Sequence, residues 1–326
     1  MFSKILQKIP TNQWTNIVLI IATIGGFVAD YFQFGYGWVA AIVVIGLVYA
    51  GYDEYKTIKF YDSKNLPIPI VINISNPASS MAALESIYKQ IDIKDHRQNL
   101  EKYFNIIDDD LIFKYDADIF NEDRFIDFLK ILKHDITQLG KRVKTNINYQ
   151  IAYIGPIANA IAVGTVFGTD GLTIYQYNKS SDSYTIAIDI KDRNYKEKIA
   201  QYEVFDIDYI GTISNETQSV TVAIDASSHQ VALNQLNEPI IHLKSMLGAT
   251  MLDTKDFIQA NREIYQTINK LQNGKRKIRL AYSMPTSIGF LLGMSIQVYW
   301  NIELTQYSQG KYKPVIRDIS KINYFF

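Results

Sequence analysis

Cysteine is absent from this chain of 326 residues, and histidine occurs only four times. The lack of cysteine excludes a disulfide framework, a thiol nucleophile, an iron–sulfur cluster and a cysteine-based zinc site, and it favours a cytosol-facing protein. The histidines are dispersed along the chain without the spacing of metal ligands, so we expect no metal site. Walker and GxGxxG motifs are also missing, and no cofactor is expected.

Net charge is missing as well, because 33 basic side chains balance 33 acidic ones. A protein that coats duplex nucleic acid needs a clear cationic excess, so duplex binding is not expected. The mean hydropathy of -0.05 averages over unlike segments, and 48% apolar residues exclude a disordered chain.

Long apolar runs are rare, but two lie near the N-terminus, at residues 14–34 and 36–52, with Asp30 as their only formal charge. A bilayer core of ~30 Å is crossed by about 20 helical residues. The runs therefore predict a two-span transmembrane hairpin within residues 1–55, followed by an exit helix or linker at residues 56–66. A buried helical hairpin in a soluble core is the alternative.

Lysines flank the predicted hairpin on one side only: Lys4 and Lys8 precede it, and Lys56 and Lys59 follow it. The short connecting loop has no lysine or arginine. The positive-inside rule then places both termini in the cytoplasm, as a multi-pass protein of a cytoplasmic membrane.

The rest of the chain has the pattern of an α/β protein. Residues 68–74 form a short apolar, β-branched run, which a polar turn and a helix-compatible stretch follow. This strand, turn and helix order is the opening unit of a parallel sheet. Residues 124–139 have helical spacing and residues 146–154 alternate as a strand.

An internal repeat is the most informative feature. Residues 152–164 read AYIGPIANAIAVG and residues 281–293 read AYSMPTSIGFLLG, so Ala-Tyr, a proline and a closing glycine coincide at a constant offset of 129 (281 minus 152). Each segment continues into an aromatic strand and a closing strand. Residues 220–225 and 239–245 read as strands, residues 256–271 as a helix and residues 277–282 as a strand. We predict two Rossmann-like repeats, at about 67–193 and 217–322.

These repeated segments, together with the final Tyr312-x-Pro314 strand, resemble the SAVED domain, over roughly residues 67–322. That family is two fused CARF-like folds, so the resemblance implies a SAVED-like ligand-sensing domain over residues 67–326. Two membrane spans fused to such a domain look like the transmembrane-SAVED effectors of bacterial CBASS antiphage systems. The resemblance implies binding of a cyclic di- or trinucleotide made by a partner nucleotidyltransferase.

The carboxyl ends of parallel strands, next to helix N-termini, are where an anionic ligand binds in α/β sheets. Four such turns are readable here, and they contain hydroxyls, small residues and two tyrosines that can stack on bases or bond to them. The candidate ligand contacts are Ser75, Asn76, Ser79, Ser80, Tyr153, Gly155, Pro156, Ser227, Ser228, His229, Tyr282, Ser283 and Thr286. Serine and asparagine in such turns also act as ordinary helix caps.

No set of residues predicts catalysis. Asp225, Ser227 and His229 lie too close together in one turn to build a triad. The basic residues at 141–144 and 275–279 either add positive potential to a ligand face or are solvated helix ends, and the acidic run at 108–110 is expected to be a solvated turn.

The leading hypothesis is a non-enzymatic membrane effector that binds a cyclic oligonucleotide, forms a homo-oligomer and disrupts the bilayer of the inner membrane. One hairpin has too few helices to enclose a water path, so oligomerisation is part of the hypothesis. Two alternatives remain: a membrane-tethered ring nuclease that cleaves the ligand, and a passive membrane-anchored scaffold.

Overall fold

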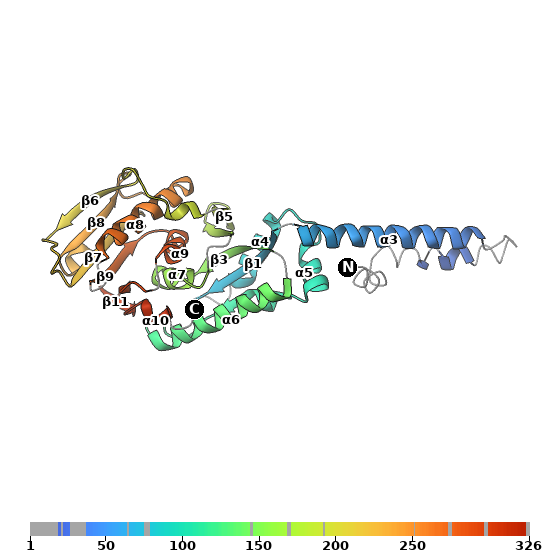
Figure 1. Cartoon of the computed structure of the whole chain (residues 1–326), viewed down its shortest axis with the longest axis horizontal. Helices are drawn as coiled ribbons and strands as arrows, with labels where there is room; N and C mark the ends of the chain where they lie inside the picture. The colour runs from blue at the N-terminus through green and yellow to red at the C-terminus, as the bar shows by residue number, and fades with distance from the viewer. Residues whose placement is uncertain are drawn as a thin grey trace. The chain divides into compact units, whose positions relative to one another are not determined.

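The computed structural model describes residues 19–20, 22–26, 37–63, 65–74, 79–143, 146–167, 171–191, 193–250, 252–272, 276–296 and 299–323. The chain divides into two compact units, Met1–Leu66 and Pro67–Phe326 (Figure 1). The predicted α/β class holds for the second unit, which contains two sheets.

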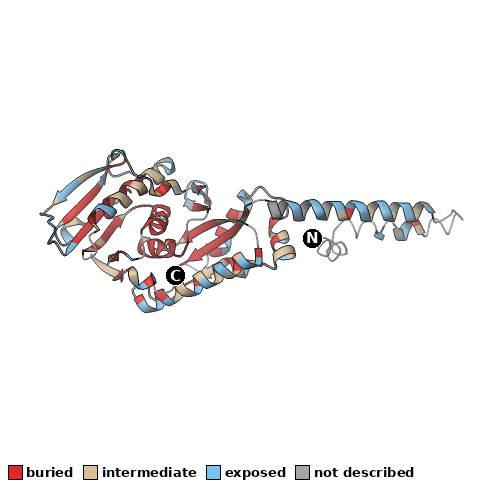
Figure 2. Ribbon diagram, in the orientation of Figure 1, coloured by how far each residue is buried: buried red, intermediate tan, exposed pale blue. Residues whose placement is uncertain are grey.

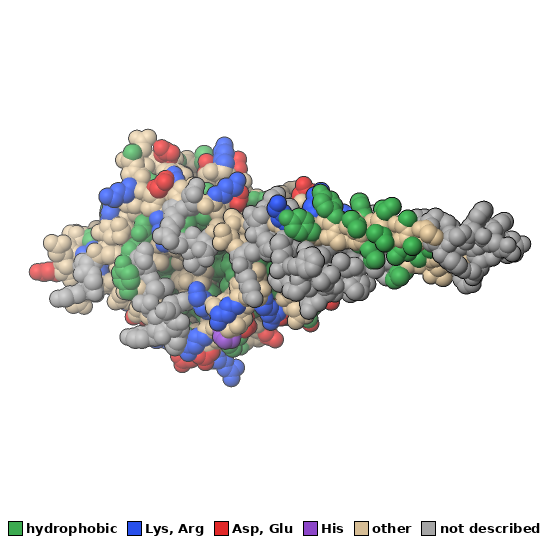
Figure 3. Space-filling model, turned by 45° about the vertical axis from the view of Figure 1, so that its right-hand side comes forward, with side chains coloured by type: hydrophobic (Ala, Val, Ile, Leu, Met, Phe, Trp, Pro, Cys, Tyr) green, Lys and Arg blue, Asp and Glu red, His purple; other side chains and the backbone are tan. Residues whose placement is uncertain are grey.

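The first unit contains one long described helix, α3 (Gly37–Ser63). Its apolar side chains face outward: Val44, Ile45 and Val48 are 60%, 68% and 67% exposed. Figure 3 shows hydrophobic side chains gathered along this helix. Within the described ranges, no helix satisfies both the length and the apolarity that a membrane span requires. Most of the first predicted span, residues 14–34, lies outside the described residues.

Helix α3 covers residues 37–52 of the second predicted span and continues through residues 56–63 of the predicted linker, while Leu66 already belongs to β1. The segment after residue 52 is therefore helical rather than an irregular connection, which agrees with the exit-helix interpretation.

The first repeat of the second unit is a five-stranded sheet with the order β2-β1-β3-β4-β5. Strands β1 and β2 pair in parallel, as do β3 and β4, whereas β4 and β5 form an antiparallel hairpin. Its strands are β1 (Leu66–Asn73), β2 (Ile112–Lys114), β3 (Ile147–Ile154), β4 (Leu172–Asn178) and β5 (Ser183–Ile190). Its helices are α4 (Ser80–Gln90), α5 (His96–Phe104), η3 (Asp108–Leu111), α6 (Glu122–Val143) and α7 (Ile157–Gly164).

The second repeat is a six-stranded sheet with the order β11-β10-β9-β7-β8-β6. Its strands are β6 (Phe205–Ile210), β7 (Ser219–Asp225), β8 (Ile240–Ser245), β9 (Lys277–Ser283), β10 (Ile302–Ser308) and β11 (Lys311–Ile316). Its helices are α8 (Phe257–Leu271), α9 (Thr286–Ser295) and α10 (Ser320–Asn323), with short 3-10 turns η4 (Arg193–Lys196), η5 (Leu233–Gln235) and η6 (Thr254–Asp256).

The predicted duplication is confirmed by the two strand orders. Read from the hairpin inward, β5-β4-β3-β1-β2 matches β11-β10-β9-β7-β8, and each sheet ends in an antiparallel hairpin. The two repeats differ in the connection between their first two strands. Helices α4 and α5 connect β1 to β2, whereas only η5 lies between β7 and β8. Strand β6 is an addition at the outer edge of the second sheet.

The repeats pack together through α7 and α9, the helices that follow the two equivalent prolines. Every described residue of α9 after Thr286 is buried, and all of α7 is buried except Ile157 (Figure 2). Small residues let the helices approach closely: an added Cβ on Gly293 would lie 1.9 Å from the Ile161 carbonyl oxygen. Phe167 and Phe290 extend the contact, with ring centroids 5.3 Å apart. The core of this unit therefore runs through the seam between the repeats.

Two sequence expectations need correction. The segment expected to join the repeats, at residues 194–216, contains β6, which pairs antiparallel with β8. The acidic run at residues 108–110 is not simply solvated, because Asp108 pairs with Arg97 and Asp110 lies 3.0 Å from an Arg142 nitrogen.

Candidate functional site

The carboxyl ends of the central strands form matching edges in the two repeats. In the first, the Ile74 amide donates to the Ile154 carbonyl over 2.8 Å and joins the ends of β1 and β3. In the second, the Ala226 amide donates to the Ser283 carbonyl over 2.7 Å and joins the ends of β7 and β9. Each edge is followed by a proline that begins α7 or α9, so the turns that sequence predicted as ligand contacts occupy equivalent places.

The turn after β3 is tightly closed. Tyr153 is 5% exposed, and its hydroxyl donates to the Pro156 carbonyl over 2.8 Å. Gly155 has a φ of +152°, and an added Cβ there would lie 2.7 Å from the Tyr153 hydroxyl. Glycine is therefore required both by backbone conformation and by space. Pro156 is the N-cap residue of α7 in an extended conformation. The three predicted residues of this turn are brought together, mainly by contacts with one another.

The turn after β9 uses the same residue pattern with different bonds. Tyr282 is 7% exposed, and its hydroxyl is buried without a hydrogen-bond partner in the part of the chain that the structure describes. The Ser283 hydroxyl lies 2.7 Å from that of Ser227, which joins the ends of β9 and β7. Thr286 is the half-buried first residue of α9. Two candidate contacts from distant segments, Ser227 and Ser283, therefore lie side by side.

Burial raises the pKa of both tyrosines well above 10.0. The Tyr312 hydroxyl adds to the effect on Tyr282, and Tyr282 adds to the effect on Tyr153. The pKa of Tyr312 is itself raised, chiefly by burial, with the Asp225 carboxylate contributing and the Ala232 amide opposing it. These side chains therefore remain neutral hydroxyls at physiological pH.

The remaining predicted contacts are more scattered. Ser79 is the N-cap residue of α4, and the buried Ser80 hydroxyl accepts a 2.8 Å bond from the Asn73 side chain. Ser228 and His229 are exposed, and the His229 amide donates to the Ser227 hydroxyl over 3.3 Å. Ser75 and Asn76 lie outside the described residues.

A buried histidine–aspartate contact at this edge was missed by sequence reasoning. His242 Nε2 lies 2.7 Å from Asp225 Oδ2, and both side chains are less than a tenth exposed. The histidines were expected to lack the spacing of metal ligands along the sequence, but β8 pairs with β7 and brings His242 to Asp225 in space. Asp225 Oδ1 also accepts the Val231 amide over 2.6 Å. The signal in the sequence was only a strand ending in aspartate, and the strand register was needed to find its partner.

Asp225 and Tyr312 fasten the segment at residues 226–232 to the second sheet. The Ala232 amide donates to the Tyr312 hydroxyl over 3.1 Å, next to the bond between Val231 and Asp225. Val231 packs with Ala223 and Ala281 in the same cluster. Both oxygens of the Asp225 carboxylate are thus occupied: Oδ1 holds this loop through the Val231 amide, and Oδ2 contacts His242 on β8.

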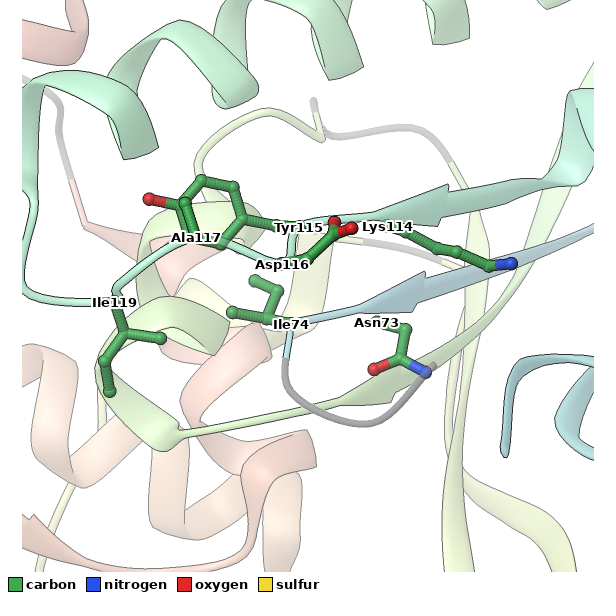
Figure 4. Close-up of a pocket in the computed structure, with 7 residues that line it drawn as sticks. All are labelled: Asn73, Ile74, Lys114, Tyr115, Asp116, Ala117 and Ile119. Atoms are coloured by element: carbon green, nitrogen blue, oxygen red, sulfur yellow. The ribbon is translucent and has the colours of Figure 1, made fainter. Parts of the chain in front are cut away.

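The first repeat has a cavity of about 390 Å³ at the ends of β1 and β2 (Figure 4). Its lining includes Asn73, Ile74, Lys114 and Asp116. This volume is near the lower end of the ~300–1,000 Å³ range of small-molecule sites. Lys114 neighbours Asn73 in the strand register as Lys244 neighbours Asp225 in the second repeat. The two edges therefore share a lysine but differ in the adjacent polar group, amide in one and carboxylate in the other.

Paired tyrosines stand opposite each other in both antiparallel hairpins. The rings of Tyr177 and Tyr184 are 5.6 Å apart, and those of Tyr307 and Tyr312 are 5.0 Å apart. Tyr177 and Tyr307 are 45% and 47% exposed, so the repeats present one tyrosine each at equivalent places. Exposed aromatic rings are suitable platforms for nucleobases.

Four described residues of the basic clusters are engaged in internal contacts. The buried Arg276 donates to three carbonyls, while Lys277 and Arg279 pair with Glu303, and Arg142 pairs with Asp110. Of the two interpretations, neither fits these residues, because they hold strands and loops together. Across the described ranges, no group of three or more histidine or acidic residues is arranged to hold a metal.

Comparison with known proteins identifies a family. The model of the SMODS-associated and fused to various effectors sensor domain, SAVED, matches residues 131–317. A search of curated proteins found no match.

Comparison with solved structures finds a receptor of similar fold. A Cap4 SAVED/CARF-domain containing receptor from Acinetobacter baumannii, solved with the cyclic trinucleotide 2′3′3′-cAAA, matches with a TM-score of 0.51 and 16% identity, covering 85% of this chain and 56% of that chain. The same receptor with 3′3′3′-cAAA gives a TM-score of 0.49 and 15% identity, over 85% and 56% of the two chains. A Cap4 receptor from Moraxella osloensis gives 0.44 and 14%, over 96% and 75%. The chain thus spans little more than half the length of the Acinetobacter receptor.

Proposed function

Because this chain belongs to the SAVED sensor-domain family, we propose that its second unit binds a cyclic di- or trinucleotide, made by a partner nucleotidyltransferase in CBASS-type antiphage defence. The observation that carries the proposal is the duplicated carboxyl edge, where the Ile74–Ile154 and Ala226–Ser283 backbone bonds hold equivalent turns, with a cavity at the ends of β1 and β2 in the first repeat. A relative of the same fold was solved with a cyclic trinucleotide.

The ligand is small and is held locally. The chain has no net charge, and several of its basic side chains, such as Lys277 and Arg279, form salt bridges within the protein. Helix N-termini, hydroxyls, exposed tyrosines and one lysine per edge, Lys114 and Lys244, remain there, and they suit a few phosphates and bases rather than a long polymer.

The first unit is the effector element in this proposal. Helix α3 exposes apolar side chains around its surface, which for a stable helix suits a nonpolar environment. Ligand binding assembles a homo-oligomer, and the assembled apolar segments disrupt the bacterial inner membrane, with both termini on the cytoplasmic side. The role is non-enzymatic, and the ligand is released intact.

Ligand binding is tested with the full chain in detergent, by calorimetry against a panel of cyclic di- and trinucleotides. Lys114→Glu places a negative charge at the cavity and is expected to weaken binding at least tenfold. Lys198→Glu, an exposed lysine in the segment after β5, is the matched control and should bind as the wild type does. If no member of the panel binds the wild type, the proposal fails.

The membrane step is tested by dye release from liposomes. Ile45→Lys, on the exposed surface of α3, is expected to abolish ligand-dependent release, whereas Ile131→Lys, an equally accessible isoleucine on α6, is expected to leave it unchanged. Sealed vesicles with ligand-bound wild type would contradict the effector role. Chromatography of the nucleotide after prolonged incubation separates sensing, which leaves the ring intact, from ring cleavage.

A further inference from the structure

The two equivalent turns differ in one hydrogen bond. Tyr153 and Tyr282 occupy the same position in the repeat, yet only the Tyr153 hydroxyl has an acceptor, the Pro156 carbonyl at 2.8 Å. The Tyr282 hydroxyl is buried and has no partner among the described residues. A buried donor without an acceptor loses its bond to water and gains nothing in return, so such groups are rare and call for an explanation.

The hydroxyl of Tyr282 is a competent donor. Burial keeps its pKa well above 10.0, with the nearby Tyr312 hydroxyl acting in the same direction, so the proton stays on the oxygen at neutral pH. The group is therefore suited to an acceptor that arrives from outside the chain.

Helix α9 begins at Thr286, four residues after Tyr282, with unsatisfied amides. Its N-cap residue Pro285 has no side chain that can cap the helix, and the Pro285 carbonyl accepts from the amides of Ile288 and Gly289. The amides of Thr286 and Ser287 have no acceptor within the described part of the chain. Free amides at a helix N-terminus, with the positive end of the helix dipole, favour a phosphate group.

We propose that the N-terminus of α9 and the Tyr282 hydroxyl form a phosphate subsite for the cyclic oligonucleotide, and that the equivalent turn at α7 does not. This inference rests on the proposed function and adds to it an asymmetry: the duplicated fold binds its ligand unequally, because the Tyr153 hydroxyl is already occupied.

The Ser227–Ser283 bond is the contact that ligand binding alters. Tyr282 is buried in this structure, so a phosphate reaches its hydroxyl only when the turn at Ser283 shifts. The 2.7 Å bond between the two serine hydroxyls holds that turn to the end of β7. Its opening links the arrival of the ligand to movement of residues 226–232.

The test compares Tyr282→Phe with Tyr153→Phe in the full chain. Without nucleotide, Tyr282→Phe removes an unsatisfied hydroxyl and should melt at or above the wild-type temperature, whereas Tyr153→Phe removes a formed bond and should melt lower. With 2′3′3′-cAAA and 3′3′3′-cAAA as probes, beside the wider panel, Tyr282→Phe should weaken binding about tenfold, the usual effect of one bond to a charged group. Tyr209→Phe, an exposed tyrosine on β6, is the binding control and should bind normally.

A second pair of variants does not depend on the tyrosine. Thr286→Ala removes only the hydroxyl, and Thr286→Pro also removes the backbone amide at a helix position that tolerates proline. Binding should fall further for Thr286→Pro than for Thr286→Ala. Wild-type affinity in both Tyr282→Phe and Thr286→Pro would overturn the subsite while leaving the proposed function intact. Absence of binding by the wild type would overturn both.

Discussion

Gly164 and Gly293 lie against each other where α7 crosses α9. A Cβ added to Gly164 would sit 3.0 Å from the Gly293 Cα and 2.1 Å from the Phe290 carbonyl oxygen. These are the glycines that close the two repeated segments of the sequence. Both repeated segments therefore end in glycine because the two helices meet there, with the backbone of one packed directly on the backbone of the other.

Gly293→Ala is expected to separate the two helices and destabilise the protein by about 3 kcal/mol, at the upper end of ordinary overpacking. Gly140→Ala is the matched control within a helix, because its added Cβ would meet nothing closer than 3.7 Å. Removing a helical glycine there should stabilise the fold by about 0.5–1 kcal/mol. Thermal melting of both variants gives the comparison, and equal melting temperatures would refute the close contact.

The repeat could be predicted from sequence because its signals are local. A strand, a tyrosine, a proline and a helix of small residues follow one another within 13 residues (164 minus 152, plus 1), and both copies fold as that order implies.

Contacts between strands distant in sequence could not be predicted. Asp225 meets His242 because β7 and β8 pair in one particular register, and a shift by one residue would turn the histidine to the other face. Strand β6 was missed because its two aspartates resemble an exposed connection, and what holds it lies 58 or more residues away, at Glu263.

Glu263 is expected to be essential for the sixth strand. It is fully buried, and its carboxylate accepts the amides of Glu203, Val204 and Phe205 at 2.7–3.1 Å where β6 begins. Glu263→Ala would leave these amides without an acceptor, and we expect a loss of at least ~3 kcal/mol, since each bond to a charged group contributes about 1.5–3. Chemical denaturation measures the loss. Glu197→Ala, an exposed carboxylate, should cost less than ~1 kcal/mol.

A polar bond across the seam is present on one side only. The Ser287 hydroxyl donates to Gln176 Oε1 over 2.5 Å, linking α9 of the second repeat to β4 of the first. At the equivalent position Gln306 Oε1 is buried without a partner in the described chain, and the residue that matches Ser287 is Ala158 (287 minus 129). The two glutamines are a natural matched pair.

Gln176→Leu is therefore expected to destabilise the protein by about 1–2 kcal/mol, because the Ser287 hydroxyl loses its acceptor. Gln306→Leu removes an atom that has no partner and should be neutral or slightly stabilising. Differential scanning calorimetry measures the stability of the two variants. Equal losses of stability would contradict the prediction that only Gln176 forms a stabilising hydrogen bond between the repeats.

Glu122 ties the start of α6 to the end of the chain, and this tie makes stability depend on pH. Its side chain is 6% exposed and contacts the Arg317 amide, the Arg317 guanidinium and the Lys321 ammonium at 2.8–3.1 Å. Burial raises the pKa of Glu122, but these three bonds lower it more, so the pKa lies below its ordinary value of 4.5. The folded state thus favours the charged carboxylate. The stabilisation is complete above about pH 4.5, the pKa of the unfolded chain, and is lost as the pH falls through the lower pKa of the folded state.

We expect Glu122→Gln to cost about 2 kcal/mol at pH 7 and much less near pH 3, measured by urea denaturation at both pH values. Asp127→Asn, an exposed partner of Lys130 on the same helix, should change stability by less than ~0.5 kcal/mol at either pH. A cost for Glu122→Gln that stays constant between the two pH values would show that the carboxylate charge is not what holds the two ends of the domain together.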